Sequence, residues 1–343
     1  MSRFYEIEPT TENYWRAIIL FGRNSASYKF ALAKALFDFQ ASGKTQIPLD
    51  ELAIPYASHL CEHLKNHPKQ GTSEQSTFLD KLRAFNQGEI TRDEMLSHTL
   101  RYGFVNVLDA FHNVHGKELE TRFFIDERKR KNAVQLTDDF MLLGETQQFS
   151  NLIQETESRW RLVEAAWENN LPRNLMLVEY EEKNSLLIGA NAIRRTAVTA
   201  ARPALNGYQK GRCFYCYREI SIVSGNNDIA EVDHFFPHML KQCDSQKPID
   251  GIANLVLACQ ECNRGQQGKF NRLPSVELLE RLFNRNEYLI TSHHPLRETL
   301  ISQTGNSTEK RQAFLQDAYT CSSLHVGASG RKWQPKPQGP AIF

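Results

Sequence analysis

Two Cys-x-x-Cys pairs constrain this sequence more than any other feature. Cys213-Phe-Tyr-Cys216 and Cys259-Gln-Glu-Cys262 stand in a chain of 343 residues that has seven cysteines. Residues 1–10 include acidic side chains and lack the apolar stretch of a secretion signal, so disulfide pairing is not the expected use of these cysteines. We interpret the four as thiolate ligands that coordinate one structural Zn²⁺ completely and leave no open position on it.

The residues around the second pair include chemically reactive side chains. Forty-two residues separate Cys216 from Cys259, whereas a zinc ribbon has roughly 15–20 there. The long insert contains Asp233-His234, and Asn263 directly follows the second pair. A neutral imidazole takes a proton from water near pH 7, and carboxylate and amide oxygens suit Mg²⁺ or Mn²⁺. The alternative interpretation is a zinc knuckle that only holds two segments together.

Residues 213–270 resemble the HNH, or ββα-metal, nuclease module in its form with four zinc-binding cysteines. The matching features are the two cysteine pairs, Asp233-His234-x-x-Pro237, Asn254-Leu255 and Cys262-Asn263-Arg264. The resemblance covers 58 of the 343 residues. Its specificity comes from the order and local spacing of these residues.

The resemblance implies a role for each matched residue. His234 would be the general base, Asp233 and Asn263 would bind a catalytic Mg²⁺ or Mn²⁺, and Asn254 would brace the loop without touching metal. The third motif position is Asn263 where the family also uses histidine, which favours an oxygen-rich site. A helix is expected to begin near Asn263, although glycines such as Gly265 weaken a helix by about 1 kcal/mol relative to Ala.

Basic residues gather just before the first cysteine pair, although the net charge of the chain is only +1. From residue 183 to residue 218 there are seven Lys or Arg residues and no Asp or Glu. Such a run can bind phosphate, but a solvated basic face gives the same pattern. The residues expected to contact a nucleic-acid backbone are Arg194, Arg195, Arg202, Lys210, Arg212, Arg264 and Lys269.

The expected fold class is α+β. We expect a mainly helical region at 1–190, the nuclease module at 191–275, helices that pack on it at 276–326 and an irregular or disordered tail at 327–343. Helical periodicity is clear at 28–39, 49–64 and 152–167, and Thr91-Arg-Asp-Glu94 is a capping box. Short strands are expected at 123–125, 134–136, 177–180 and 186–188. No run approaches the roughly 18 apolar residues of a membrane span, so we expect a cytoplasmic protein.

These features predict a metal-dependent endonuclease that hydrolyses DNA, nicking one strand as a monomer or cutting both as a dimer. A zinc-stabilised module that binds nucleic acid or protein without turnover is the rival hypothesis, and an RNA-cleaving enzyme is a third. Residues 1–190 match no motif, but they are long enough to hold a protein partner or to form a homodimer. Their combination with a nuclease module resembles components of bacterial restriction or anti-phage systems.

Overall fold

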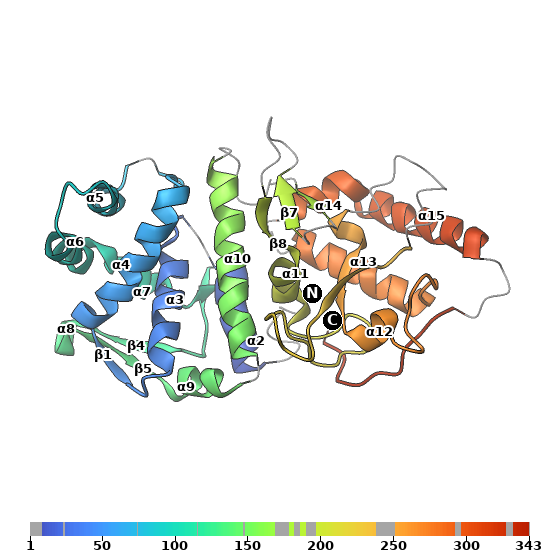
Figure 1. Ribbon diagram of the computed structural model, residues 1–343, viewed down its shortest axis with the longest axis horizontal. Helices are drawn as coiled ribbons and strands as arrows, with labels where there is room; N and C mark the ends of the chain where they lie inside the picture. The colour runs from blue at the N-terminus through green and yellow to red at the C-terminus, as the bar shows by residue number, and fades with distance from the viewer. Residues whose placement is uncertain are drawn as a thin grey trace. The chain divides into compact units, whose positions relative to one another are not determined.

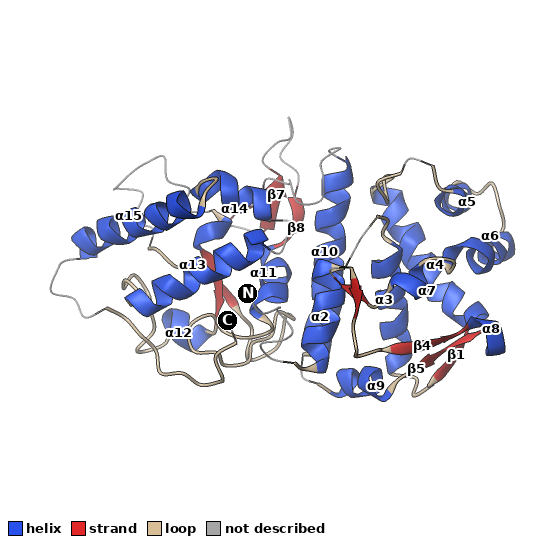
Figure 2. Ribbon diagram, turned by 180° about the vertical axis from the view of Figure 1, so that it is seen from behind, coloured by secondary structure: helices blue, strands red, loops and turns tan. Residues whose placement is uncertain are grey.

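The chain divides into two compact units, Met1–Asn170 and Leu171–Phe343, drawn in Figures 1 and 2. The computed structural model describes residues 9–22, 25–73, 75–114, 116–146, 148–168, 178–181, 186–189, 197–237, 251–291, 296–326 and 332–342. The division falls earlier in the chain than residue 190, where the sequence places the end of the helical region. No helix among the described residues is long and apolar enough to cross a membrane.

The amino-terminal unit is mainly helical and contains two small sheets. Its helices are α2 (Thr11–Phe21), α3 (Tyr28–Gln40), α4 (Leu49–Asn66), α5 (Thr77–Asn86), α6 (Arg92–His98), the π-helix Thr99–Gly103, α7 (Val107–Ala110), α8 (Arg128–Lys131), α9 (Asp138–Glu145) and α10 (Phe149–Glu168). Its strands are β1 (Gln46–Pro48), β2 (Asn113–Val114), β3 (Lys117–Glu118), β4 (Phe124–Glu127) and β5 (Ala133–Leu136). Strands β1, β5 and β4 form an antiparallel sheet in that order, and β2 pairs with β3. The three expected helices and the expected strands at 123–125 and 134–136 are confirmed.

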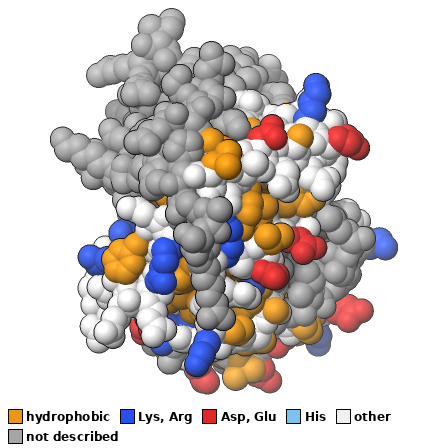
Figure 3. Space-filling model, turned by 90° about the vertical axis from the view of Figure 1, so that its right-hand side faces the viewer, with side chains coloured by type: hydrophobic (Ala, Val, Ile, Leu, Met, Phe, Trp, Pro, Cys, Tyr) orange, Lys and Arg blue, Asp and Glu red, His pale blue; other side chains and the backbone are white. Residues whose placement is uncertain are grey.

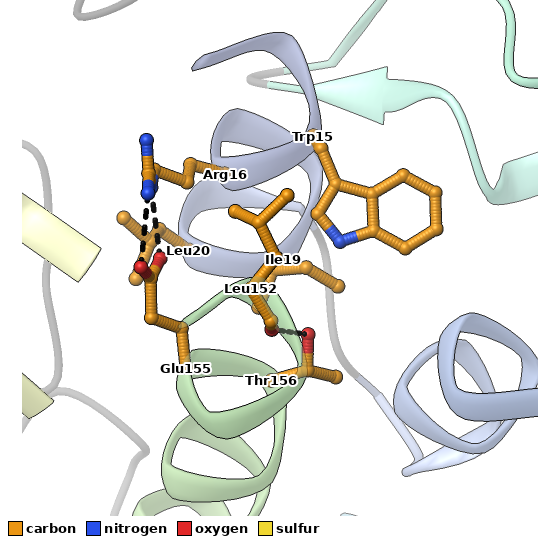
Figure 4. Close-up of a pocket in the computed structure, with 7 residues that line it drawn as sticks. All are labelled: Trp15, Arg16, Ile19, Leu20, Leu152, Glu155 and Thr156. Carbon is orange, nitrogen blue, oxygen red and sulfur yellow. Dashed lines mark hydrogen bonds and ion pairs between the residues drawn. The ribbon is translucent and has the colours of Figure 1, made fainter. Parts of the chain in front are cut away.

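Local capping and buried pairs explain why these helices form and pack. The Thr91 hydroxyl accepts from the Glu94 backbone N–H, and the Glu94 carboxylate accepts from the Thr91 backbone N–H at 2.8 Å, so the predicted capping box is present. Between α2 and α10, the Arg16 guanidinium makes two hydrogen bonds of 2.9 and 3.0 Å to the Glu155 carboxylate (Figure 4). This buried pair lies against a small, mainly apolar pocket between the two helices.

A buried polar network joins α4 to α10. The carboxylate of Glu164, which is 0% exposed, accepts hydrogen bonds from His63 Nδ1 at 2.7 Å and from Gln70 Nε2 at 2.5 Å. The other imidazole nitrogen lies 3.3 Å from Glu157 Oε2, and the ring stacks on Trp160. Burial alone lowers the pKa of His63, but the hydrogen bonds and charges of the two glutamates outweigh it, so its pKa is raised.

This network predicts a pH-dependent stability of the amino-terminal unit. Because the folded pKa of His63 is raised, its stabilisation is complete below the unfolded pKa of about 6.5 and is lost as the pH rises through the folded value. Replacing His63 with Gln removes one partner of a buried ion pair, which costs roughly 3–5 kcal/mol, and should abolish this loss at alkaline pH. Urea unfolding followed by tryptophan fluorescence from pH 6 to pH 9 measures both effects.

His59 supplies the matched control, because it lies on the same helix but pairs with Asp38 at a more exposed position. The variant His59→Gln is expected to keep the wild-type dependence of stability on pH. A His63→Gln protein whose stability falls with pH as steeply as that of the wild type would contradict the assignment.

The carboxy-terminal unit contains two further sheets and a set of helices. Its strands are β6 (Val178–Glu181), β7 (Leu186–Gly189), β8 (Ala197–Ala200), β9 (Glu231–His234) and β10 (Leu255–Ala258). Its helices are α11 (Ala201–Gln209), the 3₁₀ turn Ile252–Asn254, α12 (Gln260–Arg264), α13 (Val276–Thr291), α14 (Arg297–Thr304) and α15 (Thr308–Val326). Strands β6, β7 and β8 form one antiparallel sheet, and β9 pairs with β10 in another. The expected strands at 177–180 and 186–188 and the expected carboxy-terminal helices are confirmed.

Residues 332–342 form a packed segment, here called the C-terminal strap. Trp333 is 5% exposed, exchanges backbone hydrogen bonds with Leu273 and Ser275, and donates from Nε1 to the Gln267 carbonyl at 2.8 Å. Its ring meets that of Tyr215 edge-on at 5.0 Å. The strap has no helix and no named strand, as expected of an irregular segment, and it is held by two buried side chains, Trp333 and Ile342; residues 327–331 lie outside the described residues.

Shortening Trp333 to Ala is therefore expected to destabilise the carboxy-terminal unit by about 3–5 kcal/mol, the usual cost of removing a buried aromatic side chain. Urea unfolding monitored by zinc release measures the effect. The control is Leu324→Ala on α15, because Leu324 is 76% exposed and its loss should change stability by less than about 0.5 kcal/mol. Equal stability of the two variants would show that the strap contributes nothing.

Candidate functional site

The two cysteine pairs come together in one buried cluster. Each thiol sulfur of Cys213, Cys216, Cys259 and Cys262 lies within 4.8 Å of the other three, and all four residues are buried. The sulfurs of Cys216 and Cys259 are 3.8 Å apart. A tetrahedral Zn²⁺ with Zn–S bonds of about 2.3 Å separates its sulfurs by roughly 3.8 Å, so the cluster fits this ion. The cysteines could therefore bind a metal such as zinc.

The ionisation of the cluster also favours a bound cation. Burial raises the pKa of the Cys213 thiol well above its usual value. Without a cation, four thiolates in one buried position would repel one another at close range. A divalent metal removes this cost and holds all four sulfurs as thiolates.

Helix α13 supports the first cysteine pair and strand β10 with two arginines. Arg281 donates to the carbonyls of Phe214 and Tyr215, and its guanidinium lies 4.2 Å from the ring centre of Tyr217. Arg285 is 1% exposed and donates to the Leu255 carbonyl at 2.9 Å. These contacts tie α13 both to the segment of the first cysteine pair and to strand β10.

A two-stranded sheet and a short helix carry the other candidate residues. In the antiparallel pair of β9 and β10, His234 lies opposite Leu255 and Asp233 lies opposite Val256. Helix α12 then begins at Gln260, because the Cys259 sulfur accepts from the Cys262 backbone N–H at its amino end. The expectation that this helix begins near Asn263 is wrong, since Asn263 lies in its last turn.

The two glycines after α12 serve a tight loop instead of a longer helix. The helix ends at Arg264, and a Cβ atom at Gly265 would lie 2.6 Å from the Glu261 carbonyl oxygen. At Gly268 a Cβ atom would lie 2.7 Å from the Gly265 nitrogen. Neither close approach leaves room for a side chain, so only glycine fits at these two positions. The loop folds back onto α12, and the Lys269 N–H donates to the Cys262 carbonyl.

Asn254 braces the chain that follows His234. Its amide oxygen accepts from the Phe236 N–H at 2.8 Å, and its amide nitrogen donates to the Phe236 carbonyl at 3.3 Å. The Asn254 carbonyl accepts from the Phe235 N–H. Asn254 is buried at 6% exposure and thus holds the end of β9 through backbone contacts, the type of role that the resemblance implies for it.

Asp233 is the centre of a buried triad with Tyr215 and Lys269. The Tyr215 hydroxyl donates to Asp233 Oδ2 at 2.5 Å, and Lys269 Nζ donates to Asp233 Oδ1 at 3.1 Å. Burial raises the pKa of Tyr215 well above its usual value, so its hydroxyl keeps the proton that it donates. Carboxylate and amide oxygens are the donor types that suit Mg²⁺ or Mn²⁺, but in this conformation both Asp233 oxygens are engaged by Tyr215 and Lys269.

Glu231, like Tyr215, is a residue of this site that sequence reasoning missed. Its Oε2 accepts from Asn263 Nδ2 at 2.8 Å, and its Oε1 pairs with the Arg264 guanidinium at 2.6 Å. Side chains alternate across a strand, so Glu231 and Asp233 share one face of β9 and His234 points to the other. This period of two, counted back from Asp233, is the signal that would have identified Glu231. Asn263 and Asp233 thus contact different partners, and His234 is 7% exposed at the end of the strand.

The basic residues expected to contact nucleic acid differ in how exposed their side chains are. Lys269 and Lys210 are 1% and 5% exposed, so neither side chain faces solvent in this conformation, and their contact with phosphate stays a prediction. Each is turned inward: Lys269 to Asp233, and Lys210 to the Ile342 carbonyl of the C-terminal strap.

The arginines of the same set have mixed surroundings. Arg212 is half-buried and lies near Glu219, and Arg202 is half-buried on α11. Arg264 remains 60% exposed beside Asn263. Arg194 and Arg195 lie outside the described residues. On the face drawn in Figure 3, described basic, acidic and apolar side chains are interspersed, so no single-sign surface marks a path for nucleic acid there.

Comparisons of this chain with protein-family models, with curated proteins and with solved structures find no match. A functional interpretation therefore depends on the residues of the cluster and of strand β9, on their contacts and on the resemblance of their motif.

Proposed function

We propose that this chain is a metal-dependent endonuclease that hydrolyses phosphodiester bonds of DNA, with a structural Zn²⁺ on the four cysteines. The observation that carries the proposal is the buried four-cysteine cluster, which joins the knuckle at 213–216 to the helix that presents Asn263. Asn263 reaches β9, the strand of Asp233 and His234, through its hydrogen bond to Glu231. Binding alone would need neither a base nor hard oxygen donors at these positions.

The reaction needs a base, an attacking water and a neutralised phosphate. His234 takes a proton from water, and the resulting hydroxide attacks phosphorus. The bond from phosphorus to the 3′ oxygen breaks, and the leaving 3′ oxygen takes a proton from water. A Mg²⁺ or Mn²⁺ held by Asp233 and Asn263 would supply charge stabilisation at the phosphate. Asn254 keeps the segment after His234 in place, and Tyr215 orients the Asp233 carboxylate. By resemblance the products have 5′-phosphate and 3′-hydroxyl ends.

The exposed arginines beside Asn263 are the described candidates for backbone contacts. Arg264 is 60% exposed, and Arg272 is an exposed residue that donates to the Gly268 carbonyl of the same loop. Such contacts give an affinity for nucleic acid that falls as the salt concentration rises and that depends little on the base sequence. The amino-terminal unit would then serve target choice, partner binding or dimerisation.

One set of incubations distinguishes the proposal from its rivals. Purified protein is mixed with supercoiled plasmid, linear duplex DNA and RNA in the presence of Mg²⁺, Mn²⁺ or EDTA. We expect nicked or linear plasmid with either metal and intact plasmid with EDTA. Cleavage of RNA alone would show that the substrate is RNA instead of DNA. Binding without cleavage of any substrate would favour a zinc-stabilised binding module.

A further inference from the structure

The carboxylate of Asp233 is already paired with a cation that belongs to the chain. Lys269 Nζ lies 3.1 Å from Asp233 Oδ1, and the two side chains are only 1% and 9% exposed. The same ammonium donates to the Phe270 carbonyl at 3.2 Å. The carboxylate and the ammonium therefore form a buried ion pair.

The position of the ammonium is set by the loop that follows α12. The Lys269 backbone N–H bonds to the Cys262 carbonyl, and the neighbouring Phe270 N–H bonds to the Asn263 carbonyl. Glycines fill the two positions of this loop where a Cβ atom would collide with backbone. Trp333 of the C-terminal strap holds the loop from outside through the Gln267 carbonyl. The loop is thus anchored through the Lys269 backbone to a candidate zinc ligand and through the Phe270 backbone to a candidate metal ligand.

We propose that Lys269 is an internal cation that competes with the catalytic metal for Asp233. A divalent ion and an ammonium on one buried carboxylate would repel each other strongly, because little water screens them. Metal therefore binds after the Lys269 ammonium has left Asp233 Oδ1, while Tyr215 keeps hold of Oδ2. The ammonium that leaves is then available to an anionic substrate. The identity of the competing metal rests on the proposed function.

The test is Mn²⁺ binding by the full, zinc-loaded chain, measured by electron paramagnetic resonance of free Mn²⁺. Lys269→Met removes the charge, and Lys269→Gln removes it but keeps a hydrogen-bond donor for Asp233. Both variants should bind Mn²⁺ about ten-fold or more tightly than the wild type, since a neighbouring positive charge is gone. Adding Asp233→Asn to either variant should abolish the gain.

Lys210→Met is the matched control, because Lys210 is also a buried lysine, and its ammonium donates to the Ile342 carbonyl, whereas Asp233 is held by Tyr215 and Lys269. Its Mn²⁺ affinity should equal that of the wild type. Equal affinities of the wild type and both Lys269 variants would overturn the inference. If the variants fold poorly, Mn²⁺ should restore their zinc content and thermal stability, and failure at every Mn²⁺ concentration would also overturn it.

The readout separates this inference from the proposed function. A protein whose Mn²⁺ affinity rises on loss of Lys269 but which cuts neither DNA nor RNA supports the competition and contradicts the nuclease. A protein that cuts DNA but whose Mn²⁺ affinity does not depend on Lys269 supports the nuclease and contradicts the competition.

Discussion

Replacing Cys259 with Ser is expected to remove Zn²⁺ from the protein and to unfold the region around residues 213–270. Cys259 has two functions in the structure, as one of four clustered sulfurs and as the residue that caps α12. Zinc binding is worth roughly 10–16 kcal/mol in small modules, which is as much as the whole stability of an ordinary domain. Metal analysis of untagged protein and limited proteolysis measure the loss.

Cys61 provides the matched control for this prediction. It is a buried cysteine of α4, and burial raises its pKa to about 11, so it stays a neutral thiol. The variant Cys61→Ser should keep one zinc per chain and an intact carboxy-terminal unit. Wild-type protein without stoichiometric zinc, or a Cys259→Ser protein that retains it, would refute the zinc assignment.

Replacing His234 with Ala is expected to lower the cleavage rate by about 10²–10⁴-fold, the usual contribution of a general base. Zinc content and DNA binding should remain near those of the wild type, because the base acts in the transition state and adds little to binding of the ground state. Asp233→Asn and Asn263→Ala should also lose activity, and a higher Mn²⁺ concentration should restore part of it. Single-turnover cleavage of plasmid with saturating enzyme measures the chemical step.

His59 of α4 is a suitable control. It belongs to the amino-terminal unit, where it pairs with Asp38, and it has no place in the proposed chemistry. A His59→Ala protein should cut at the wild-type rate. If His234→Ala cuts equally fast, His234 is not the base, and another group must take the proton from water.

Much of the fold followed from local patterns. Helices α3, α4 and α10 appear where apolar residues recur at helical spacing, because these apolar residues are buried in the amino-terminal unit. The capping box at Thr91 also depends only on residues three apart. The start of α12 was misjudged because a cysteine is an uncommon cap, and Cys259 caps this helix through its sulfur.

The candidate site could be predicted in its composition but not in its pairings. The spacing of the two cysteine pairs was enough to predict one cluster, since two Cys-x-x-Cys pairs are typical of a tetrahedral zinc site. The bracing role of Asn254 came from resemblance to a family. The contact between Glu231 and Asn263 spans 32 residues and depends on how β9 meets α12, which no local pattern reports.

The sequence by itself determined that residues 28–39, 49–64 and 152–167 are helical and which four cysteines gather, because both depend on short, regular spacing. Only the tertiary structure decided that Lys210 and Lys269 are buried, that the C-terminal strap is packed and that Asp233 has a lysine as its partner. The physical reason is that a charged residue in a sequence gives no sign of whether its side chain is buried in the fold. Its neighbours come from distant segments, and those neighbours decide whether it faces water, a phosphate or a buried carboxylate.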